Sequence, residues 1–183
     1  MSSDGPVPAP YCMRAAQPAD IPALMRLKCL LAESEDSLHA VRASEADWLR
    51  DGFGPGAGFT AFVAQDGQAG AIVGMATCSR RAVTGWDGPV IFLQDLIVEP
   101  AFRQHGVARA LVARVAALAC EIGSPIVELT VRADNERAQK FYQRHGFALL
   151  PQCLTYVLAG TALASLAGHD AQDGQERKLE LAG

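Results

Sequence analysis

The sequence predicts an α/β fold in which a mixed, mostly antiparallel central sheet carries helices on both faces. The order of segments is the first reason, because two helical patterns precede a group of extended runs, and helices then alternate with strands. The second reason is the run over residues 90–98, whose nearly continuous apolar character is typical of a buried central strand. The third is length, since 183 residues that are 50% hydrophobic can bury one sizeable core.

The first quarter of the chain shows one strand and two helices. Residues 11–15 form a short strand-like run, and apolar residues then recur at helical spacing over residues 21–31. Ser44 followed by Asp47 resembles a capping sequence and predicts the start of a second helix. We expect Gly52 to end that helix.

A hairpin follows a loop rich in Gly and Pro. Its strands are expected over residues 59–64 and 71–78. They are joined across Asp66 and Gly67, a dipeptide suited to a tight turn with positive φ.

A crossover unit is expected next. Residues 90–98 are the longest strand candidate, and the two polar residues within it, Gln94 and Asp95, are conspicuous there. A long helix with apolar residues along one face ends at Gly123, and a strand follows over residues 126–131. Strand, helix and strand in this order predict a parallel strand pair.

The C-terminal part adds one helix and one strand. The helix is expected over residues 135–145, with Gly146 as its C-cap, and the last strand over residues 154–158. We therefore expect a single domain over residues 11–167, between a loose N-terminal tail at 1–10 and a polar tail at 168–183.

Composition argues against several classes of protein. A formal net charge of −4 lacks the basic excess that binding to a phosphate backbone needs, so we expect no nucleic acid partner. The first ten residues lack the pattern of a signal peptide, and no apolar run reaches the roughly 18 residues of a membrane span, which predicts a cytoplasmic protein without membrane contact. Histidine and cysteine spacings support no metal site.

The five cysteines are odd in number and far apart. They lie mostly in apolar stretches, so we expect reduced thiols that pack in the core. No Cys stands in a recognisable arrangement with a His and an orienting carboxylate, which disfavours a covalent cysteine intermediate.

The strongest motif follows the buried strand. Pro100 stops the strand, and a short loop then opens a helix whose first turn holds Gly106 and the small Ala108. Unpaired backbone N–H groups at a helix start bind anions, and small side chains let a diphosphate come close to the backbone. Arg103 and Arg109 add positive charge around this turn.

A second motif lies further along the chain. Asn135 is a suitable N-cap, and the helix it opens places Asn135, Ala138 and Tyr142 near one face, before Gly146 and Phe147.

Together the two motifs resemble those of the GCN5-related N-acetyltransferase superfamily, in the same order and separation. The matching residues are Arg103, Gly106 and Ala108 in the first motif, and Asn135, Ala138, Tyr142, Gly146 and Phe147 in the second. A closer likeness, to the diamine (spermidine/spermine-type) acetyltransferase branch, covers about residues 13–167. It is carried by residues 49–54, Trp86, residues 92–98 and residues 156–163.

This resemblance implies the acyl-CoA N-acyltransferase fold, acetyl-CoA as cosubstrate, no metal and a homodimer. The backbone of the central strand would pair with the pantetheine arm of the cofactor, the opening turn of the next helix would hold the diphosphate, and the second motif would hold the distal part. The implied cofactor-binding residues are Leu96, Ile97, Val98, Arg103, Gln104, His105, Gly106, Val107, Ala108, Arg109, Asn135, Arg137 and Tyr142.

Tyr142 is the candidate catalytic residue. A phenol with a pKa near 10 can protonate a leaving thiolate, so the resemblance gives it the role of general acid. The alternative is an aromatic core residue beside Phe141.

The substrate side departs from the diamine branch. The implied acceptor-binding residues are Glu35, Trp86, Gln94 and Asp95. Polyamine enzymes have a Glu at the position of Gln94 and an Asp at that of Thr84, so two anions are missing, which argues against spermine. Asp95, Glu35 or a water can still accept the amine proton. Glu35 can equally be part of a solvated helix end.

The sequence therefore predicts transfer of an acetyl group from acetyl-CoA to a primary amine of a small molecule, by direct attack in a ternary complex. The amine could belong to a diamine, a lysine-like amino acid or a related compound. The alternatives are a protein or peptide N-acetyltransferase and a CoA-binding module without turnover.

Overall fold

The computed structural model describes residues 11–85, 87–153, 155–159, 162–163 and 166–167. The chain divides into two compact units, one that ends at Asn135 and one that begins at Glu136.

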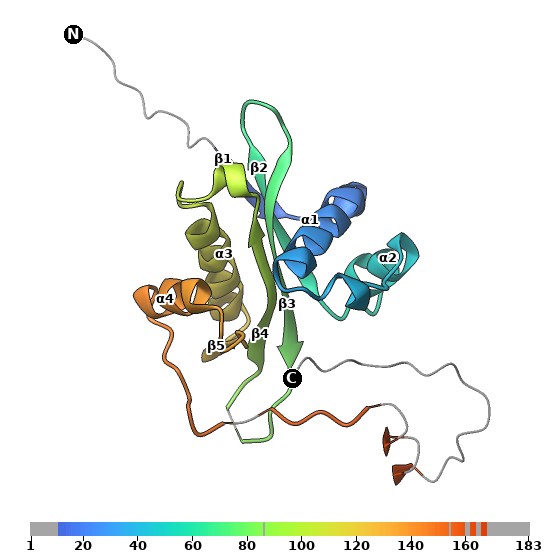
Figure 1. The fold of residues 1–183 in the computed structure, drawn as a ribbon, viewed down its shortest axis with the longest axis vertical. Helices are drawn as coiled ribbons and strands as arrows, with labels where there is room; N and C mark the ends of the chain where they lie inside the picture. Colours follow the sequence, from blue (N-terminus) through green and yellow to red (C-terminus); the bar gives the residue numbers. More distant parts are fainter. Residues whose placement is uncertain (1–10, 86, 154, 160–161, 164–165, 168–183) are drawn as a thin grey trace. The chain divides into compact units, whose positions relative to one another are not determined.

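The first unit is built on a five-stranded sheet whose strands lie in chain order (Figure 1). Strands β1 to β4 pair antiparallel with their neighbours, and β5 joins β4 in parallel. This arrangement confirms the predicted mixed, mostly antiparallel sheet. The bounds are β1 Tyr11–Ala15, β2 Thr60–Asp66, β3 Ile72–Arg81, β4 Val90–Val98 and β5 Ile126–Glu128.

Helices cover both faces of this sheet (Figure 1). Leu24, Leu27 and Trp48, from α1 and α2, pack with Met75 and Ile97 of the sheet in one buried cluster. On the opposite face α3 approaches so closely that a Cβ at Gly74 would lie 3.3 Å from a methyl group of Leu111. The bounds are α1 Ile21–Ser34, α2 Glu45–Phe53 and α3 Val107–Glu121, with 3-10 turns at Pro18–Asp20, Leu38–Ala40 and Pro100–Phe102.

The second unit contains α4, Glu136–Arg144. Gly146 follows it with a φ of 88°, as expected for the residue after a helix end. The strand expected over residues 154–158 is wrong for residues 155–158, which lie in no strand, and Leu154 lies outside the described residues. Tyr156 is 88% exposed, so no neighbouring strand covers its side chain.

Two expectations about glycines are also wrong. Helix α2 continues through Gly52 to Phe53, and Gly54 is the C-cap. Gly52 is needed for packing instead, because a Cβ there would lie 2.6 Å from the ring of Phe59. In the β2–β3 hairpin the positive φ, 69°, belongs to Gly70 and not to Gly67, because the connection is longer than a two-residue turn.

The side chain of Asp20 ties β1 to the start of α1. Arg14 donates to both carboxylate oxygens of Asp20, at 2.6 and 2.9 Å, and the backbone N–H of Gln17 donates to the same carboxylate at 2.7 Å. The hydrogen bond from Arg14 is the main reason that the pKa of Asp20 lies below its ordinary value of 3.8. A lowered folded-state pKa stabilises the fold above that ordinary value and loses its effect as the pH falls through the folded-state pKa.

Replacing Asp20 by Asn should therefore lower the free energy of unfolding by roughly 1 kcal/mol at neutral pH, with a gap that narrows in acid as the wild-type carboxylate is protonated. Urea unfolding at pH 7 and below pH 3.8 measures both effects. The Arg14→Met variant and the double variant complete the cycle. A deficit in Asp20→Asn that stays the same in acid would contradict this account.

Candidate functional site

Strand β4 has one open edge. It pairs with β3 along its length, but β5 joins it only through Val90, Ile91 and Phe92. From Leu93 to Val98 no strand within the described residues lies along the edge that faces away from β3. Backbone groups on such an edge can pair with an extended ligand as an added strand would. Leu96, Ile97 and Val98, the residues expected to hold the pantetheine arm, lie on this segment.

The start of α3 is a cluster of backbone donors. Its N-cap is Gly106, with a φ of 79° and no capping side chain, and the first intrahelical bond runs from Ala110 N–H to Gly106. The N–H groups of Val107, Ala108 and Arg109 therefore have no intrahelical acceptor. Helix α2 differs, because the hydroxyl of its N-cap Ser44 accepts from the third N–H of the helix at 3.2 Å. The start of α3 has the form of an anion site.

The loop before this helix places the other predicted cofactor residues. Gln104 has a φ of 68°, so two left-handed residues within three positions turn the backbone sharply into the helix. Gln104, His105 and Arg109 are exposed, and Arg103 Nε donates to the carbonyl oxygen of Val98 at 2.9 Å. That bond ties the loop to the end of β4, so the open edge and the donor cluster lie next to each other.

The remaining predicted cofactor residues lie at or after the boundary between the units. Asn135 is the last residue of the first unit, and Arg137 and Tyr142 lie on α4 of the second. The half-buried ring of Tyr142 contacts the rings of Phe141 and Phe147, with centroids 5.3 Å apart in both pairs. Aromatic packing, the alternative role of Tyr142, is thus present, and catalysis stays a prediction.

A β-bulge places the conspicuous polar residues of β4. Thr77 pairs with Asp95 and Cys78 pairs with Leu93, so Gln94 is an extra residue without a partner on β3. A bulge shifts the alternation of side chains between the two faces of a sheet. As a result Phe92, Gln94 and Asp95 all line one cavity, which strict alternation would prevent.

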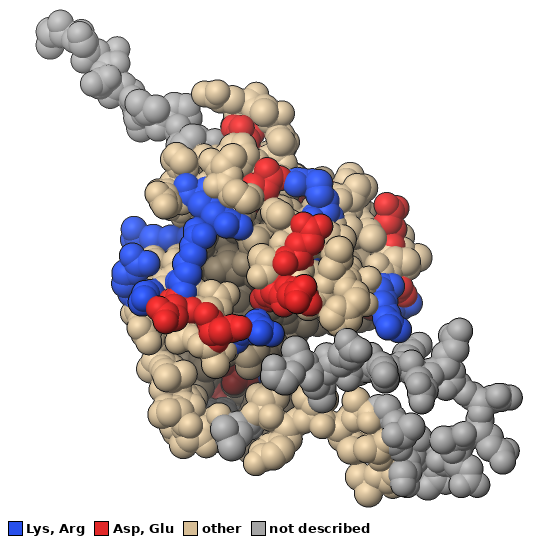
Figure 2. All heavy atoms as spheres, viewed as in Figure 1, with Lys and Arg blue, Asp and Glu red and all other residues tan. Residues whose placement is uncertain are grey.

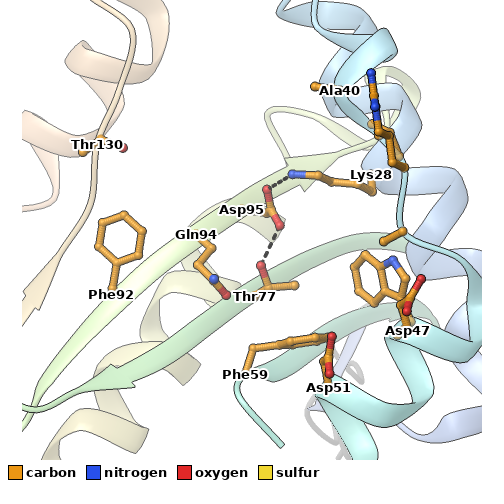
Figure 3. Close-up of a pocket in the computed structure, with 14 residues that line it drawn as sticks. Lys28, Ala40, Asp47, Asp51, Phe59, Thr77, Phe92, Gln94, Asp95 and Thr130 are labelled. Atoms are coloured by element: carbon orange, nitrogen blue, oxygen red, sulfur yellow. Dashed lines mark hydrogen bonds and ion pairs between the residues drawn. The ribbon is translucent and has the colours of Figure 1, made fainter. Parts of the chain in front are cut away.

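The cavity lies within the first unit and has a volume of about 480 Å³, a size suited to a small molecule (Figure 3). It combines aromatic walls with carboxylates from α2 and β4 and two cationic side chains. The lining residues are Lys28, Ala40, Val41, Arg42, Ala43, Asp47, Trp48, Asp51, Phe59, Thr77, Phe92, Gln94, Asp95 and Thr130.

Asp95 is held by two neighbours in this cavity (Figure 3). Lys28 of α1 donates to one carboxylate oxygen at 2.6 Å, and the buried Thr77 hydroxyl donates to the other at 2.7 Å. Neither residue has a local signal of function, because Lys28 lies in the amphipathic pattern of α1 and Thr77 in the buried run of β3. The packing of α1 against the sheet brings Lys28 to Asp95, and the register of β3 with β4 places Thr77 opposite it.

Two further carboxylates were missed for a different reason. Asp47 and Asp51 lie one turn apart on α2, and Arg50 binds both, at 2.8 and 2.7 Å. The backbone N–H of Ser44, then its hydroxyl and Arg50, lower the pKa of Asp47 to about 2, and Arg50 lowers the pKa of Asp51. In the sequence Asp47 has the position of a capping residue, and its second position, on the cavity wall, follows only from the tertiary structure.

Two predicted acceptor residues lie elsewhere. Glu35 is the half-buried C-cap of α1 and is not among the residues that line the cavity. Trp86 lies outside the described residues.

The cysteines are free thiols, but the expectation that they pack in the core is wrong for most of them. Only Cys78 is buried, whereas Cys29 is half-buried and Cys12, Cys120 and Cys153 are exposed. Burial raises the pKa of Cys78 to about 11, so this thiol beside the site is a poor nucleophile at neutral pH.

The side chains and helices of the described residues bear on metal ligation, membrane spans and surface charge. They contain no group of three His, Cys, Asp or Glu side chains placed to hold a metal ion. None of their helices has the length and apolar character needed to span a membrane. The face drawn in Figure 2 carries both basic and acidic side chains.

Comparison with known proteins agrees with this geometry. The chain is 30% identical over 165 residues to thialysine N-epsilon-acetyltransferase of Mus musculus, an alignment that covers 85% of this chain and 96% of the relative. An aminoglycoside N-acetyltransferase solved in complex with CoA superposes with a TM-score of 0.66 at 25% identity, covering 84% of this chain and 97% of that one. An integron cassette protein of V. cholerae, at 20% identity, shares the fold with a TM-score of 0.72 and coverage of 86% and 98%.

The profile of the acetyltransferase (GNAT) family matches residues 22–147, which is more than half of the chain. The open edge of β4 and the uncapped start of α3 fit the acetyl-CoA on which such enzymes depend. The chain belongs to the acetyltransferase (GNAT) family and is an acetyl-CoA-dependent N-acetyltransferase.

Proposed function

We propose that this enzyme acetylates a primary amine of a small molecule, by direct attack of the amine on the acetyl thioester in a ternary complex. The observation that carries the proposal is the bulge at Gln94, which turns Gln94 and Asp95 into a cavity of about 480 Å³ at the residues that precede the open edge. An amine held there would lie beside a cofactor arm paired with Leu96–Val98. The names of the mouse thialysine enzyme and of the aminoglycoside enzyme support a small amine as acceptor.

The side chains of the cavity have roles that suit this chemistry. Carboxylates and the aromatic ring of Trp48 favour an organic cation in the cavity, and Asp95 or a water beside it accepts the proton that the amine must lose. As the amine nitrogen forms the amide bond, the carbon–sulfur bond breaks, and Tyr142 supplies the proton for the departing sulfur. A homodimer and a cytoplasmic location remain predictions from the sequence.

The acceptor class is tested by measuring thiol release from acetyl-CoA with diamines, with amino acids that bear a side-chain amine and with peptides, and by identifying products by mass spectrometry. We expect acetylated small amines. Products found only with peptides would favour the alternative of a peptide N-acetyltransferase. Binding of CoA without thiol release on any amine would favour a binding module.

Replacing Tyr142 by Phe should reduce kcat by about 100-fold or more, because the ring is retained while the acidic proton is lost. Affinity for acetyl-CoA, measured by calorimetry, should stay close to that of the wild type. Tyr156→Phe is the matched control, because Tyr156 is 88% exposed. An unchanged kcat in Tyr142→Phe would remove Tyr142 from the chemistry and leave it as an aromatic packing residue.

Replacing Gly106 by Ala should weaken CoA binding by about tenfold, because a side chain strains the left-handed backbone that aims the N–H groups of α3 at the diphosphate. Gly70→Ala is a control with equal strain, since Gly70 has a φ of 69° in the β2–β3 hairpin. Both variants should lose similar thermal stability. Equal CoA affinity in the two variants would contradict the phosphate-binding role of this turn.

A further inference from the structure

Some charged side chains on the cavity wall form ion pairs within the described part of the protein, and one does not. Each acidic side chain already has a cation, since Lys28 binds Asp95 and Arg50 binds both Asp47 and Asp51. Arg42 also lines the cavity, is exposed, and forms no ion pair or hydrogen bond with any of the residues that the structure describes. The wall therefore presents one guanidinium whose charge is left for a ligand.

This distribution disfavours an acceptor whose two positive charges are not offset by an anion. A second ammonium group without an anion beside it would have to displace Lys28 from Asp95, where the nitrogen–oxygen distance is 2.6 Å and Thr77 supports the same carboxylate. The three carboxylates are balanced by Lys28, Arg50 and Arg42, so the site has no excess of negative charge for a dication. A ligand that carries an anion as well as amines matches this balance better.

A carboxylate suits Arg42 in particular. The planar guanidinium can donate two parallel hydrogen bonds to it, which a lone ammonium cannot do. The diphosphate of the cofactor is a poor competitor for Arg42. The N–H groups proposed to bind the diphosphate belong to α3, which packs against the opposite face of the sheet from α1 and α2.

We propose that Arg42 is a specificity-determining residue that binds a carboxylate of the acceptor, so that the enzyme selects amino acids with a side-chain amine over the corresponding diamines. This inference rests on the proposed acetylation of small amines. Lys28 contributes by keeping Asp95 occupied, which removes the advantage that a diamine would gain from a free carboxylate. Neither residue stood out in the sequence.

Matched pairs of substrates test the proposal, because lysine and cadaverine, like ornithine and putrescine, differ only in the carboxylate. The wild type should prefer the amino acid in kcat/KM by about tenfold or more. Arg42→Gln should reduce that ratio to within about twofold, mainly through KM. Arg42→Lys, which keeps the charge but loses the paired hydrogen bonds, should give an intermediate ratio. Calorimetry of lysine binding in the presence of CoA should follow the same order.

Arg80→Gln is the control, because Arg80 is an exposed arginine of β3 that does not line the cavity, and its ratio should equal that of the wild type. Diamines acetylated as well as amino acids by the wild type, or an unchanged ratio in Arg42→Gln, would overturn the role of Arg42 while the proposed function stands. Acetylation confined to amines without a carboxylate would do the same. No thiol release with any amine would remove the proposed function and this inference together.

Discussion

The divergence of β5 from β4 is the constraint on which the site depends. The two strands share three residue pairs, Val90 to Phe92 on β4, and then separate, so the last part of β4 keeps a partner on one edge only. Hydrogen bonds to β3 hold that segment in place while its other edge stays available. A backbone held in this way is a rigid template for an extended ligand, and it needs no special side chains.

Functional groups gather at this divergence because one continuous segment runs from the open part of β4 into the start of α3. The bulge at Gln94 turns polar side chains into the cavity on the face of α1 and α2. A few residues later, Pro100 ends the strand and the chain opens α3 with uncapped N–H groups. One segment of about fifteen residues thus supplies both polar side chains of the cavity and the uncapped N–H groups, which we propose to serve the acceptor and the cofactor respectively.

Charge pairing in the cavity shows that packing decides whether a carboxylate is available to a substrate. Asp95 was expected to hold an amine or accept its proton, yet Lys28 already occupies one of its oxygens. The effective charge of the site is therefore set by three elements, α1, α2 and β4, and by the loop that carries Arg42. Substrate choice in such a site depends on differences between nearly balanced charges, so single substitutions can shift it.

The sequence by itself determined the fold class, the family and the helix start after Pro100, because these depend on local features: apolar periodicity, Pro100 as a strand stop, and Gly106 and Ala108 at a helix start. Local patterns misplaced the end of α2, the turn glycine of the hairpin and the strand at residues 155–158, since those depend on a distant ring, on turn length and on a neighbouring strand. Only the tertiary structure decided which side chains face the cavity. Lys28 and Thr77 contact Asp95 there, and Arg42 lines the same cavity. Lys28 and Asp95 lie 67 residues apart, and no spacing along the chain encodes that contact.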